Sequence, residues 1–462
     1  MQLKVKNTNE LLSHGDKPAR EKVLHLLNSV LEEVDTGKRI RKLMRLDGDM
    51  LRIGKKSWDL RKKRNIYLLG AGKACNSMAQ AVCDVLGERI TKSIIAVKIA
   101  EAGDRYVNTD VYVGGHPLPN TEGLEAAKAM LALIDAAGPD DLFISVISGG
   151  SSSLIAYPVD GITLEDEIIA HDMLLKTGAG IGEINSVRRH ISRTNGGRIA
   201  ERIVAAKAEL INLILSDSIS VHPPEDRSVP VKAVGTPVAP DNSTIEDARN
   251  MILNYELRES LPANITNYLW DDTKVRETPK EFGGLVTSFR VGVVSDSCAA
   301  ATAVAKKMGI PLMILTTYLE GESRDAGVVL ASVAKEIRKW GRPINPPCFL
   351  VCSGETTVRV TAAPKGTGGP SQEFALSVAA GIRGMSSVAC AAVDTDGTDG
   401  PTLVAGGIVD GKTMDRLDVC GISVAEALRY HSTGAALKSI GDLIITGNTG
   451  TNLCDFNVIY IE

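Results

Sequence analysis

Three short segments of the chain combine glycines with acids, hydroxyls and an amide: Gly354–Thr357, Gly368–Phe374 and Asp394–Gly400. Glycine lets a backbone approach a ligand closely, and its N–H groups can hold phosphate oxygens. Paired carboxylates such as Asp396 and Asp399 are ligands that Mg²⁺ accepts in proteins. The segments therefore indicate a phosphate and metal site, although turns of this composition also simply end strands.

The segment Gly70-Ala71-Gly72-Lys73 follows an apolar run and precedes a helical pattern. It lacks the spacing between glycines and the final hydroxyl of a Walker A motif. A helix N-terminus nevertheless favours anions, and Lys73 adds a mobile positive charge. An anion site is one interpretation, and a tight strand-to-helix turn is the other.

The serine-rich segment Ser148–Ser153 follows a continuous apolar strand pattern. Ser148, Gly149, Gly150 and Ser151 bring hydroxyls and backbone N–H groups to the start of a helix, where an anion can bind. The order Gly-x-Ser-x-Gly of a nucleophile elbow is absent. The alternative interpretation is a cluster of helix-capping serines.

The segment Asn185–His190 carries two neighbouring arginines. On a helix, Asn185 shares a face with Arg189, and Arg188 shares one with Ser192. A guanidinium can hold a carboxylate or phosphate with two hydrogen bonds. A solvated basic face is the alternative, and His116 and His171 are more typical of structural histidines than of catalysts.

The composition favours a soluble α/β protein of two domains. The chain has 462 residues, 44% of them hydrophobic and 23% charged, with 44 glycines and 4% aromatic residues. This length exceeds one ordinary core, and the small residues suit closely packed α/β layers. The net charge of −4 gives no reason to expect nucleic-acid binding.

The cysteine pattern and the hydropathy indicate the cellular compartment of the protein. The eight cysteines show no repeated metal-ligand or disulfide spacing, and most lie in apolar surroundings. No apolar run approaches the roughly 18 residues of a membrane span, and the N-terminus lacks the apolar core of a signal peptide. We therefore expect a cytoplasmic protein that binds neither membranes nor nucleic acids.

Apolar strand patterns alternate with helical patterns, which predicts βαβ units and a mainly parallel sheet. The expected strands of the first half are residues 66–69, 94–97, 111–113, 142–147 and 211–215. Ligands bind beyond the carboxyl ends of such strands. Four candidate site loops follow these ends: Gly70–Lys73, Gly114–Pro119, Ser148–Ser153 and Ser216–Ser220.

A proline-rich stretch over residues 219–245 and a charged stretch over residues 270–284 separate two sets of elements. We therefore expect an N-terminal domain over residues 1–275 and a C-terminal domain over residues 285–462. The second set includes strands at residues 289–294, 312–316, 348–352 and 388–393. Residues 357–361 are expected to form the hairpin partner of strand 348–352.

The order of these pieces closely resembles the glycerate 2-kinases of the two-domain type whose C-terminal part is named MOFRL. The resemblance runs along nearly the whole chain. It rests on Gly70–Lys73, Gly115–Pro119, Ser148–Gly150, Asn185–Arg188, Gly196–Arg198, Ser216-Asp217, Pro240–Thr244, Glu320–Arg324, Ser353–Thr357, Gln372–Ala375, Asp396–Thr402, Gly441-Asp442 and Thr446–Asn452. It implies two three-layer αβα domains with mostly parallel sheets and a site in the cleft between them.

The resemblance also implies ATP-dependent phosphorylation of glycerate at its 2-hydroxyl, with ATP and Mg²⁺ as cofactors. It gives catalytic roles to Lys73, Asp217 and Arg188. Binding of ATP, phosphate or the hydroxy acid is expected at Gly70, Gly72, Ser148, Gly149, Gly150, Ser151, Asn185, Glu355, Thr356, Gln372 and Glu373. Asp396 and Asp399 are expected to hold the metal, and a homodimer is a further expectation.

The chain departs from the family pattern in its site loops. Ser151 stands where the family usually has a third glycine, and Asn195 replaces a lysine. Pro370 and Ser371 replace an Arg-Asn pair whose arginine is associated with catalysis. Three alternatives follow: a kinase of another hydroxy or sugar acid, a binding paralogue with weakened catalysis, and an oxidoreductase on hydroxypyruvate. The last lacks a Gly-x-Gly-x-x-Gly motif with an acid placed for ribose.

Overall fold

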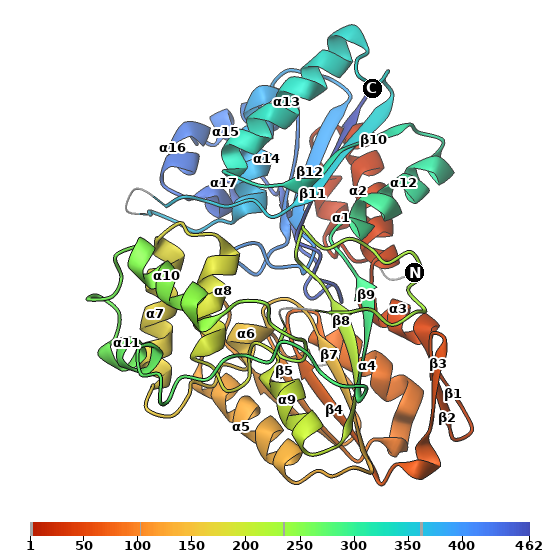
Figure 1. Ribbon diagram of the computed structural model, residues 1–462. Helices are drawn as coiled ribbons and strands as arrows, with labels where there is room; N and C mark the ends of the chain where they lie inside the picture. Colours follow the sequence, from red (N-terminus) through yellow and green to blue (C-terminus); the bar gives the residue numbers. More distant parts are fainter. Residues whose placement is uncertain (1–2, 102, 234–235, 361–363) are drawn as a thin grey trace. The chain divides into compact units, whose positions relative to one another are not determined.

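The computed structural model describes residues 3–101, 103–233, 236–360 and 364–462. The chain forms two compact units (Figure 1). The amino unit contains Thr36–Leu215 and Pro224–Val291, and the carboxyl unit contains the segment ending at Asp35, Ser216–Pro223 and Gly292–Glu462. Each unit is built around one six-stranded sheet.

The sheet of the amino unit has the strand order β6-β5-β4-β7-β8-β9. The pairs of β6 to β5, β5 to β4, β4 to β7 and β7 to β8 are all parallel, as expected from the alternation of strands and helices. The strands are β4 (Asn65–Ala71), β5 (Lys92–Val97), β6 (Thr109–Val113), β7 (Asp141–Ile147), β8 (Glu209–Leu215) and β9 (Val286–Gly292). β4 and β7 are apolar on both faces because helices cover both.

Helices form the two outer layers of the amino unit. α4 (Cys75–Leu86) packs against β4, β5 and β7, while α5 (Thr121–Asp135) and α9 (Arg198–Ala205) share a core with the other sheet face (Figure 1). A small antiparallel sheet of β1 (Met44–Asp47), β2 (Met50–Ile53) and β3 (Lys56–Asp59) follows α3 (Thr36–Leu43). The 3₁₀ helices η1 (Leu60–Lys62) and η2 (Gly87–Arg89) flank β4 and β5.

A separate helical core in the amino unit is formed by four helices and their flanking loops. These are α7 (Leu164–Lys176), α8 (Ile181–His190), α10 (Ile245–Asn254) and α11 (Ala263–Leu269). Thr163 and Asp166 form a capping box at the start of α7, and Thr244 and Asp247 form another at the start of α10. The short α6 (Ser151–Leu154) follows β7 in the chain and precedes α7.

The sheet of the carboxyl unit has the order β10-β11-β15-β12-β13-β14. Only β10 and β11 are parallel; the other four pairs are antiparallel. The α/β class and three layers agree with expectation, but this sheet is mixed rather than mostly parallel. The strands are β10 (Leu312–Leu319), β11 (Cys348–Gly354), β12 (Val388–Asp394), β13 (Gly406–Asp410), β14 (Leu443–Ile444) and β15 (Asp455–Ile461).

The mixed pairing has a local cause. β12 returns to β13 through a loop without a helix, and such a connection makes neighbouring strands antiparallel. β15 lies between β11 and β12, so the last strand of the chain occupies the centre of the sheet. The expected hairpin partner at residues 357–361 does not form: Thr357 makes one bridge to Glu322, residues 358–360 are irregular, and residue 361 lies outside the described residues.

The carboxyl sheet is covered on both faces (Figure 1). α12 (Asp296–Met308) packs on β10 and β11, while α13 (Ser323–Trp340) and α14 (Pro370–Gly381) lie together across the sheet from it. Apart from α2, the remaining helices of this unit are α1 (Thr8–Leu11), α15 (Thr413–Val419), α16 (Val424–Arg429) and α17 (Thr433–Ser439). Cys348 and Cys352 share one face of β11 and lie in the core as expected for buried thiols.

The N-terminal segment belongs to the carboxyl unit. α2 (Lys17–Glu33) packs against β12 and β15, far along the chain (Figure 1). The side chain of Arg20 is fully buried and is paired with Asp410 and, at 2.8 Å, with Asp442. The division expected between residues 275 and 285 is therefore corrected: the segment up to Asp35 and Ser216–Pro223 join the carboxyl unit, and the chain enters that unit for good at Gly292.

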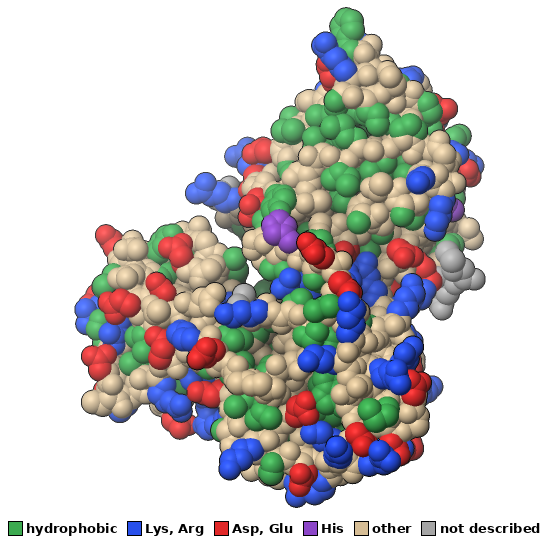
Figure 2. Space-filling view, turned by 45° about the vertical axis from the view of Figure 1, so that its right-hand side comes forward, with side chains coloured by type: hydrophobic (Ala, Val, Ile, Leu, Met, Phe, Trp, Pro, Cys, Tyr) green, Lys and Arg blue, Asp and Glu red, His purple; other side chains and the backbone are tan. Residues whose placement is uncertain are grey.

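Within the described residues, no helix has the length and apolar character needed to cross a membrane. Figure 2 shows basic and acidic side chains interspersed over the visible face.

Candidate functional site

Two of the expected loops meet at the carboxyl ends of β4 and β7 in the amino unit. The backbone N–H of Lys73 donates to the carbonyl of Gly149 over 2.9 Å, and the N–H of Ala74 donates to Ser148 Oγ over 3.0 Å. Gly72 has a φ of +130°, and a Cβ there would lie 2.2 Å from Ser148 Oγ. Gly72 is therefore required by both conformation and space.

The serine loop, defined as Ser148–Ser153, also holds the third expected loop. Ser153 Oγ donates to the carbonyls of Gly115 and Pro117 over 2.9 and 2.7 Å. Gly150 has a φ of +83°, and a Cβ there would lie 2.9 Å from the His116 ring and 3.2 Å from Lys73 Cγ. The Lys73 side chain thus passes directly beside Gly150, and Ser151 begins α6 from a buried position.

The arginine expected to bind the acid reaches the same loop. Arg188 donates to Ser152 Oγ over 2.9 Å and to Asn185 Oδ1 over 3.1 Å. Asn195 Nδ2 donates to the carbonyl of Ser152 over 3.2 Å. Arg189 instead pairs with Asp241 over 2.7 Å. The amino unit therefore brings Gly70, Gly72, Lys73, Asn185, Arg188 and the serine loop together.

Burial shifts the pKa values of Arg188 and of the nearby residues Glu167 and His171. It lowers the pKa of Arg188 to about 10, with Glu167 acting in the opposite direction. It raises the pKa of Glu167 to about 7, against the attraction of Arg188. The His171 pKa falls to about 3 through burial and the nearby Arg188 charge, so this imidazole is neutral.

Glu167 was not among the residues expected from the sequence. Glu167 and His171 are four residues apart on α7, and both lie on its buried face. Glu167 Oε2 and His171 Nδ1 have no hydrogen-bond partner. A pair of ionisable residues at helical spacing among apolar ones was the available signal, but it did not say which group they would face.

In the carboxyl unit, acids gather where β11 and β12 end and β15 begins. Asp455 is paired in register with Gly354 on β11 and with Asp394 on β12. Asp455 Oδ2 accepts from the N–H and the hydroxyl of Thr356 over 3.1 and 2.8 Å. The pKa of Asp455 lies well above its usual range because of burial and the charges of Asp394 and Asp399.

Asp399 serves as a cap for α14. Its two carboxylate oxygens accept from the backbone N–H groups of Ser371 and Gln372 and from Gln372 Nε2, over 2.9–3.0 Å. A Cβ on Gly369 would lie 2.3 Å from Asp399 Cγ. Burial raises the Asp399 pKa to about 7, although these hydrogen bonds act to lower it.

Asp396 lies in the turn after β12. Its Oδ1 accepts from the N–H and hydroxyl of Thr398, and its own N–H donates to Asp394 Oδ1 over 3.0 Å. Among the described residues, no group of three or more His, Cys, Asp and Glu side chains is arranged to hold a metal ion. The donor set around Asp394 and Asp396 consists of oxygens, which suits a Mg²⁺ ion that keeps waters and phosphate oxygens as its other ligands.

Asp217 comes from a distant part of the chain to the same unit. Its Oδ2 accepts from Asn452 Nδ2 over 3.4 Å, and its carbonyl accepts from Cys454 Sγ over 3.0 Å. The acidic edge, defined as Asp217, Asp394, Asp396, Asp399 and Asp455, thus draws on three segments. Asp455 and Asn452 were missed as site candidates because a polar residue before a strand is common in sequences.

Glu355, Glu373 and Gln372 have different environments. Glu355 is exposed, with its N–H bonded to the carbonyl of Leu319 over 2.8 Å. Glu373 is buried and lies 2.8 Å from His431 Nδ1; burial raises its pKa, while the His431 contact lowers it. Gln372 Oε1 and Glu373 Oε2 are buried without hydrogen-bond partners.

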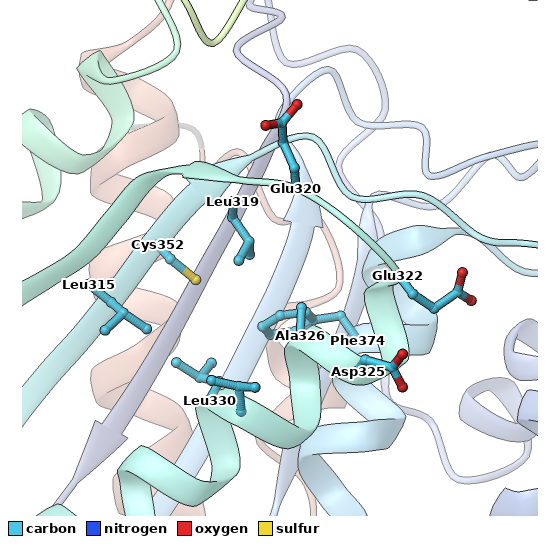
Figure 3. A pocket seen from close by; sticks show the side chains of 10 residues that line it. Leu315, Leu319, Glu320, Glu322, Asp325, Ala326, Leu330, Cys352 and Phe374 are labelled. Carbon is cyan, nitrogen blue, oxygen red and sulfur yellow. The ribbon is translucent and has the colours of Figure 1, made fainter. Parts of the chain in front are cut away.

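A pocket beside β10 and α13 is mainly apolar (Figure 3). Leu315, Leu319, Leu330, Cys352 and Phe374 line it, while the carboxylates of Glu322 and Asp325 lie at its margin. It belongs to the carboxyl unit and holds none of the acids of the acidic edge.

Two family descriptions match the chain in order. Residues 22–270 match the family described as Domain of unknown function (DUF4147), and residues 348–455 match the MOFRL family. The two matches include the amino-unit loops and the greater part of the carboxyl sheet.

Several relatives with known names are similar to this chain over most of its length. The chain is 37% identical over 437 residues to a glycerate 2-kinase from Pyrococcus horikoshii, covering 94% of this chain and 95% of the relative. It is 38% identical over 392 residues to a D-glycerate 2-kinase from Thermotoga maritima, covering 84% and 89%. A crystal structure of glycerate kinase from Thermotoga maritima aligns with a TM-score of 0.76 at 32% identity, covering 97% of this chain and all of that one.

Proposed function

Because the chain belongs to the glycerate 2-kinase family, we propose that it transfers the γ-phosphoryl group of ATP to the 2-hydroxyl of glycerate, giving 2-phosphoglycerate and ADP. The observation that carries the proposal is the junction of Lys73, the serine loop and Arg188 in the amino unit. Phosphoryl transfer depends mainly on positioning and charge neutralisation, and this junction supplies cations and N–H donors for both.

The amino unit supplies the groups that hold anions. Lys73, beside Gly150, neutralises charge on a phosphate group. The hydroxyls and backbone N–H groups of the serine loop, including the Ser151 hydroxyl, offer donors to a phosphate or to the carboxylate of the acid. Arg188, oriented by Asn185 and Ser152, holds the carboxylate.

The carboxyl unit supplies carboxylates and polar side chains. Mg²⁺ bound at Asp396, with Asp394 beside it, would neutralise charge on the phosphates. Asp399 supports this segment by capping α14, and Asp217 orients the accepting hydroxyl. Glu355, Thr356, Gln372 and Glu373 contact the ligands, and the buried unpartnered atoms of Gln372 and Glu373 support a polar contact there.

The structure has a specific feature in favour of a related substrate. Asn195, which stands where the family usually has a lysine, contacts the serine loop at Ser152. The uncharged amide of Asn195 therefore contacts the same serine as Arg188, at a position where the family usually has a positive charge. A longer hydroxy or sugar acid is for this reason the second candidate substrate. The protein is proposed to work in the cytoplasm; its described cysteines are free thiols, as expected for a reducing compartment.

The test is coupled measurement of ADP release with MgATP and D-glycerate, L-glycerate or longer sugar acids. Turnover on D-glycerate at about 1–100 s⁻¹ is expected. Activity only on a longer acid would replace glycerate as the substrate. ATP binding without turnover on any acid would overturn the kinase proposal in favour of a binding protein, and NADH oxidation with hydroxypyruvate would overturn it in favour of a reductase.

A further inference from the structure

The buried carboxylate of Glu373, which the proposed function places against a ligand, is held by a histidine. Glu373 Oε1 lies 2.8 Å from His431 Nδ1, and the two residues are 1% and 8% exposed. An ionised carboxylate oxygen can only accept, so the Nδ1–H of His431 donates to it. The other oxygen, Oε2, has no hydrogen-bond partner within the described part of the chain. His431 therefore fixes one oxygen of Glu373 and leaves the other for a further contact.

The backbone of His431 has a conformation that usually belongs to glycine. His431 follows the end of α16 and has a φ of +54°, and the N–H of Ser432 donates to the carbonyl of Ala427 over 2.9 Å. This is the Schellman ending of a helix, in which the residue with positive φ is most often glycine because a side chain there is strained. The helix ending therefore does not account for a histidine at this position, whereas the contact with Glu373 does.

The segment that carries His431 is fastened to the loop that leads into α14. The N–H of Lys365 donates to the carbonyl of Tyr430, and the N–H of Gly434 donates to the carbonyl of Thr367, both over 3.0 Å. α14 also packs against α16 and α17, the helices on either side of this segment (Figure 1). Because the backbone is held on both sides of His431, the imidazole meets the carboxylate from a fixed position.

The first turn of α14 presents hydrogen-bond acceptors. Gln372 Nε2 donates to Asp399 Oδ2 and Thr402 Oγ1 over 2.9 and 3.1 Å, so its Oε1 remains as an acceptor. Among the described residues, neither this atom nor Glu373 Oε2 has a hydrogen-bond partner. Acceptors match hydroxyl groups, which donate, and repel the negatively charged oxygens of a phosphate. The ligand group that fits here is therefore a hydroxyl.

We propose that His431 is a positioning residue for Glu373: its imidazole holds one carboxylate oxygen so that the other accepts from a hydroxyl group of a bound substrate. This inference rests on the proposed function, which places Glu373 against a ligand, and it deepens that function by naming the group bound there. The hydroxy acid and the ribose of ATP both carry hydroxyls, and the kinetics below tell these two sources apart.

Two substitutions separate the imidazole of His431 from its backbone. His431→Gly removes the donor and suits the positive φ, so the fold is expected to persist. His431→Asn keeps an N–H donor on a short side chain and also tolerates a positive φ. In steady-state kinetics, His431→Gly should raise the KM for the substrate that carries the hydroxyl by about tenfold, with a smaller change in kcat. His431→Asn should restore most of this loss, whereas damage to the fold would lower kcat and leave both KM values unchanged.

A double-mutant cycle shows whether His431 acts through Glu373. In a Glu373→Ala background, His431→Gly should raise neither KM any further, because the group that it positions is gone. Lys207→Gly is the matched control, since Lys207 is exposed in the amino unit and also has a positive φ, of +59°. It should keep the wild-type KM values. A tenfold effect of His431→Gly that persists in the Glu373→Ala background would overturn the inference, as would wild-type KM values for both substrates in His431→Gly.

The substrate whose KM rises identifies the hydroxyl. A rise in the KM for MgATP assigns it to the ribose, a rise in the KM for the acid assigns it to the acid, and either result supports the inference. Calorimetric binding of a non-hydrolysable ATP analogue and of D-glycerate distinguishes the inference from the proposed function. Binding that weakens in His431→Gly, without phosphorylation of any acid by wild type, supports the inference and overturns the kinase. Phosphorylation of D-glycerate with unchanged KM values in His431→Gly does the reverse, and if neither ligand binds, both proposals fail.

Discussion

Arg188 donates a 2.9 Å hydrogen bond to Ser152 Oγ, so α8 holds the loop that follows β7. The same loop accepts the Lys73 N–H at Gly149 and the amide of Asn195 at Ser152. Two segments that are distant in sequence from the serine loop, one at Lys73 and one from Arg188 to Asn195, therefore fix its shape. Such preorganisation reduces the entropy that binding must overcome.

Replacing Arg188 by lysine should weaken binding of the acid. Lysine keeps the charge but cannot hold Asn185, Ser152 and an anion with one planar group. We expect Arg188→Lys to raise the KM for the acid by about 10- to 100-fold, the worth of one or two hydrogen bonds to a charged group, with a smaller change in kcat. Steady-state kinetics measures both.

The control for this variant is Arg202→Lys, because Arg202 pairs with Asp135 on the surface of the same unit. It should leave KM unchanged. An Arg188→Lys enzyme with wild-type KM would remove Arg188 from the acid site.

Replacing Lys73 by alanine should strongly slow turnover without unfolding the amino unit. The backbone N–H of Lys73, which bonds to Gly149, is kept in alanine, so the loop geometry survives. Loss of a cation beside the transferring phosphoryl group is expected to lower kcat by about 10²- to 10³-fold. Lys128→Ala, on the exposed surface, is the control for a lost lysine. Wild-type kcat in Lys73→Ala would contradict the assigned role.

Replacing Arg20 by methionine should destabilise the carboxyl unit. Arg20 is fully buried between Asp410 and Asp442, so the change leaves two buried carboxylates with less compensation. We expect a loss of about 3–5 kcal/mol in the free energy of unfolding. Thermal or urea denaturation followed by circular dichroism measures it.

Arg383→Met is the matched control, since Arg383 pairs with Asp415 and Asp418 while half exposed. It should leave the midpoint of unfolding nearly unchanged. An Arg20→Met protein as stable as Arg383→Met would show that the N-terminal segment does not depend on this ion pair.

Stability should fall with rising pH through the titration of Glu167. Its pKa is raised by burial from 4.5 to about 7, so the folded state favours the protonated form. This contribution is complete below about pH 4.5 and is lost as the pH rises through 7. Glu167→Gln, which cannot ionise, should therefore gain stability relative to wild type by up to about 3 kcal/mol between pH 5 and 8.

Unfolding midpoints in urea at pH 5, 6, 7 and 8 test this difference. A wild type and a Glu167→Gln protein with parallel pH profiles would show that Glu167 titrates in its ordinary range.

The parts predicted from sequence are those in which local pattern decides the structure. The apolar runs at residues 66–69 and 142–147 form β4 and β7. A strand that is buried on both faces consists almost entirely of apolar residues, so its sequence alone predicts it. The same patterns placed the loops Gly70–Lys73 and Ser148–Ser153 at the ends of these strands, while their role as anion sites stays a prediction, because glycine and serine also form ordinary turns and helix caps.

The parts that could not be predicted depend on long-range packing. The apolar face of α2 is visible in the sequence, but its partners β12 and β15 lie more than 350 residues later, so the domain division was misplaced. The hydrogen bonds of Asp399 to the start of α14 depend on how a loop folds back, while its role as a metal ligand stays a prediction. Neither the packing of α2 on β12 and β15 nor the capping of α14 by Asp399 can be predicted from the spacing of neighbouring residues.

Replacing Pro370 by arginine should raise turnover. Pro370 is the first residue of α14, where a backbone N–H has no helical partner, so a non-proline residue is tolerated there. The family resemblance places an arginine associated with catalysis at this position. We expect Pro370→Arg to increase kcat by at least about tenfold, as one more cation stabilises charge on the phosphoryl group. Pro370→Ala separates the added cation from the lost proline ring. Equal kcat in wild type, Pro370→Ala and Pro370→Arg would show that another cation of the chain already does this work.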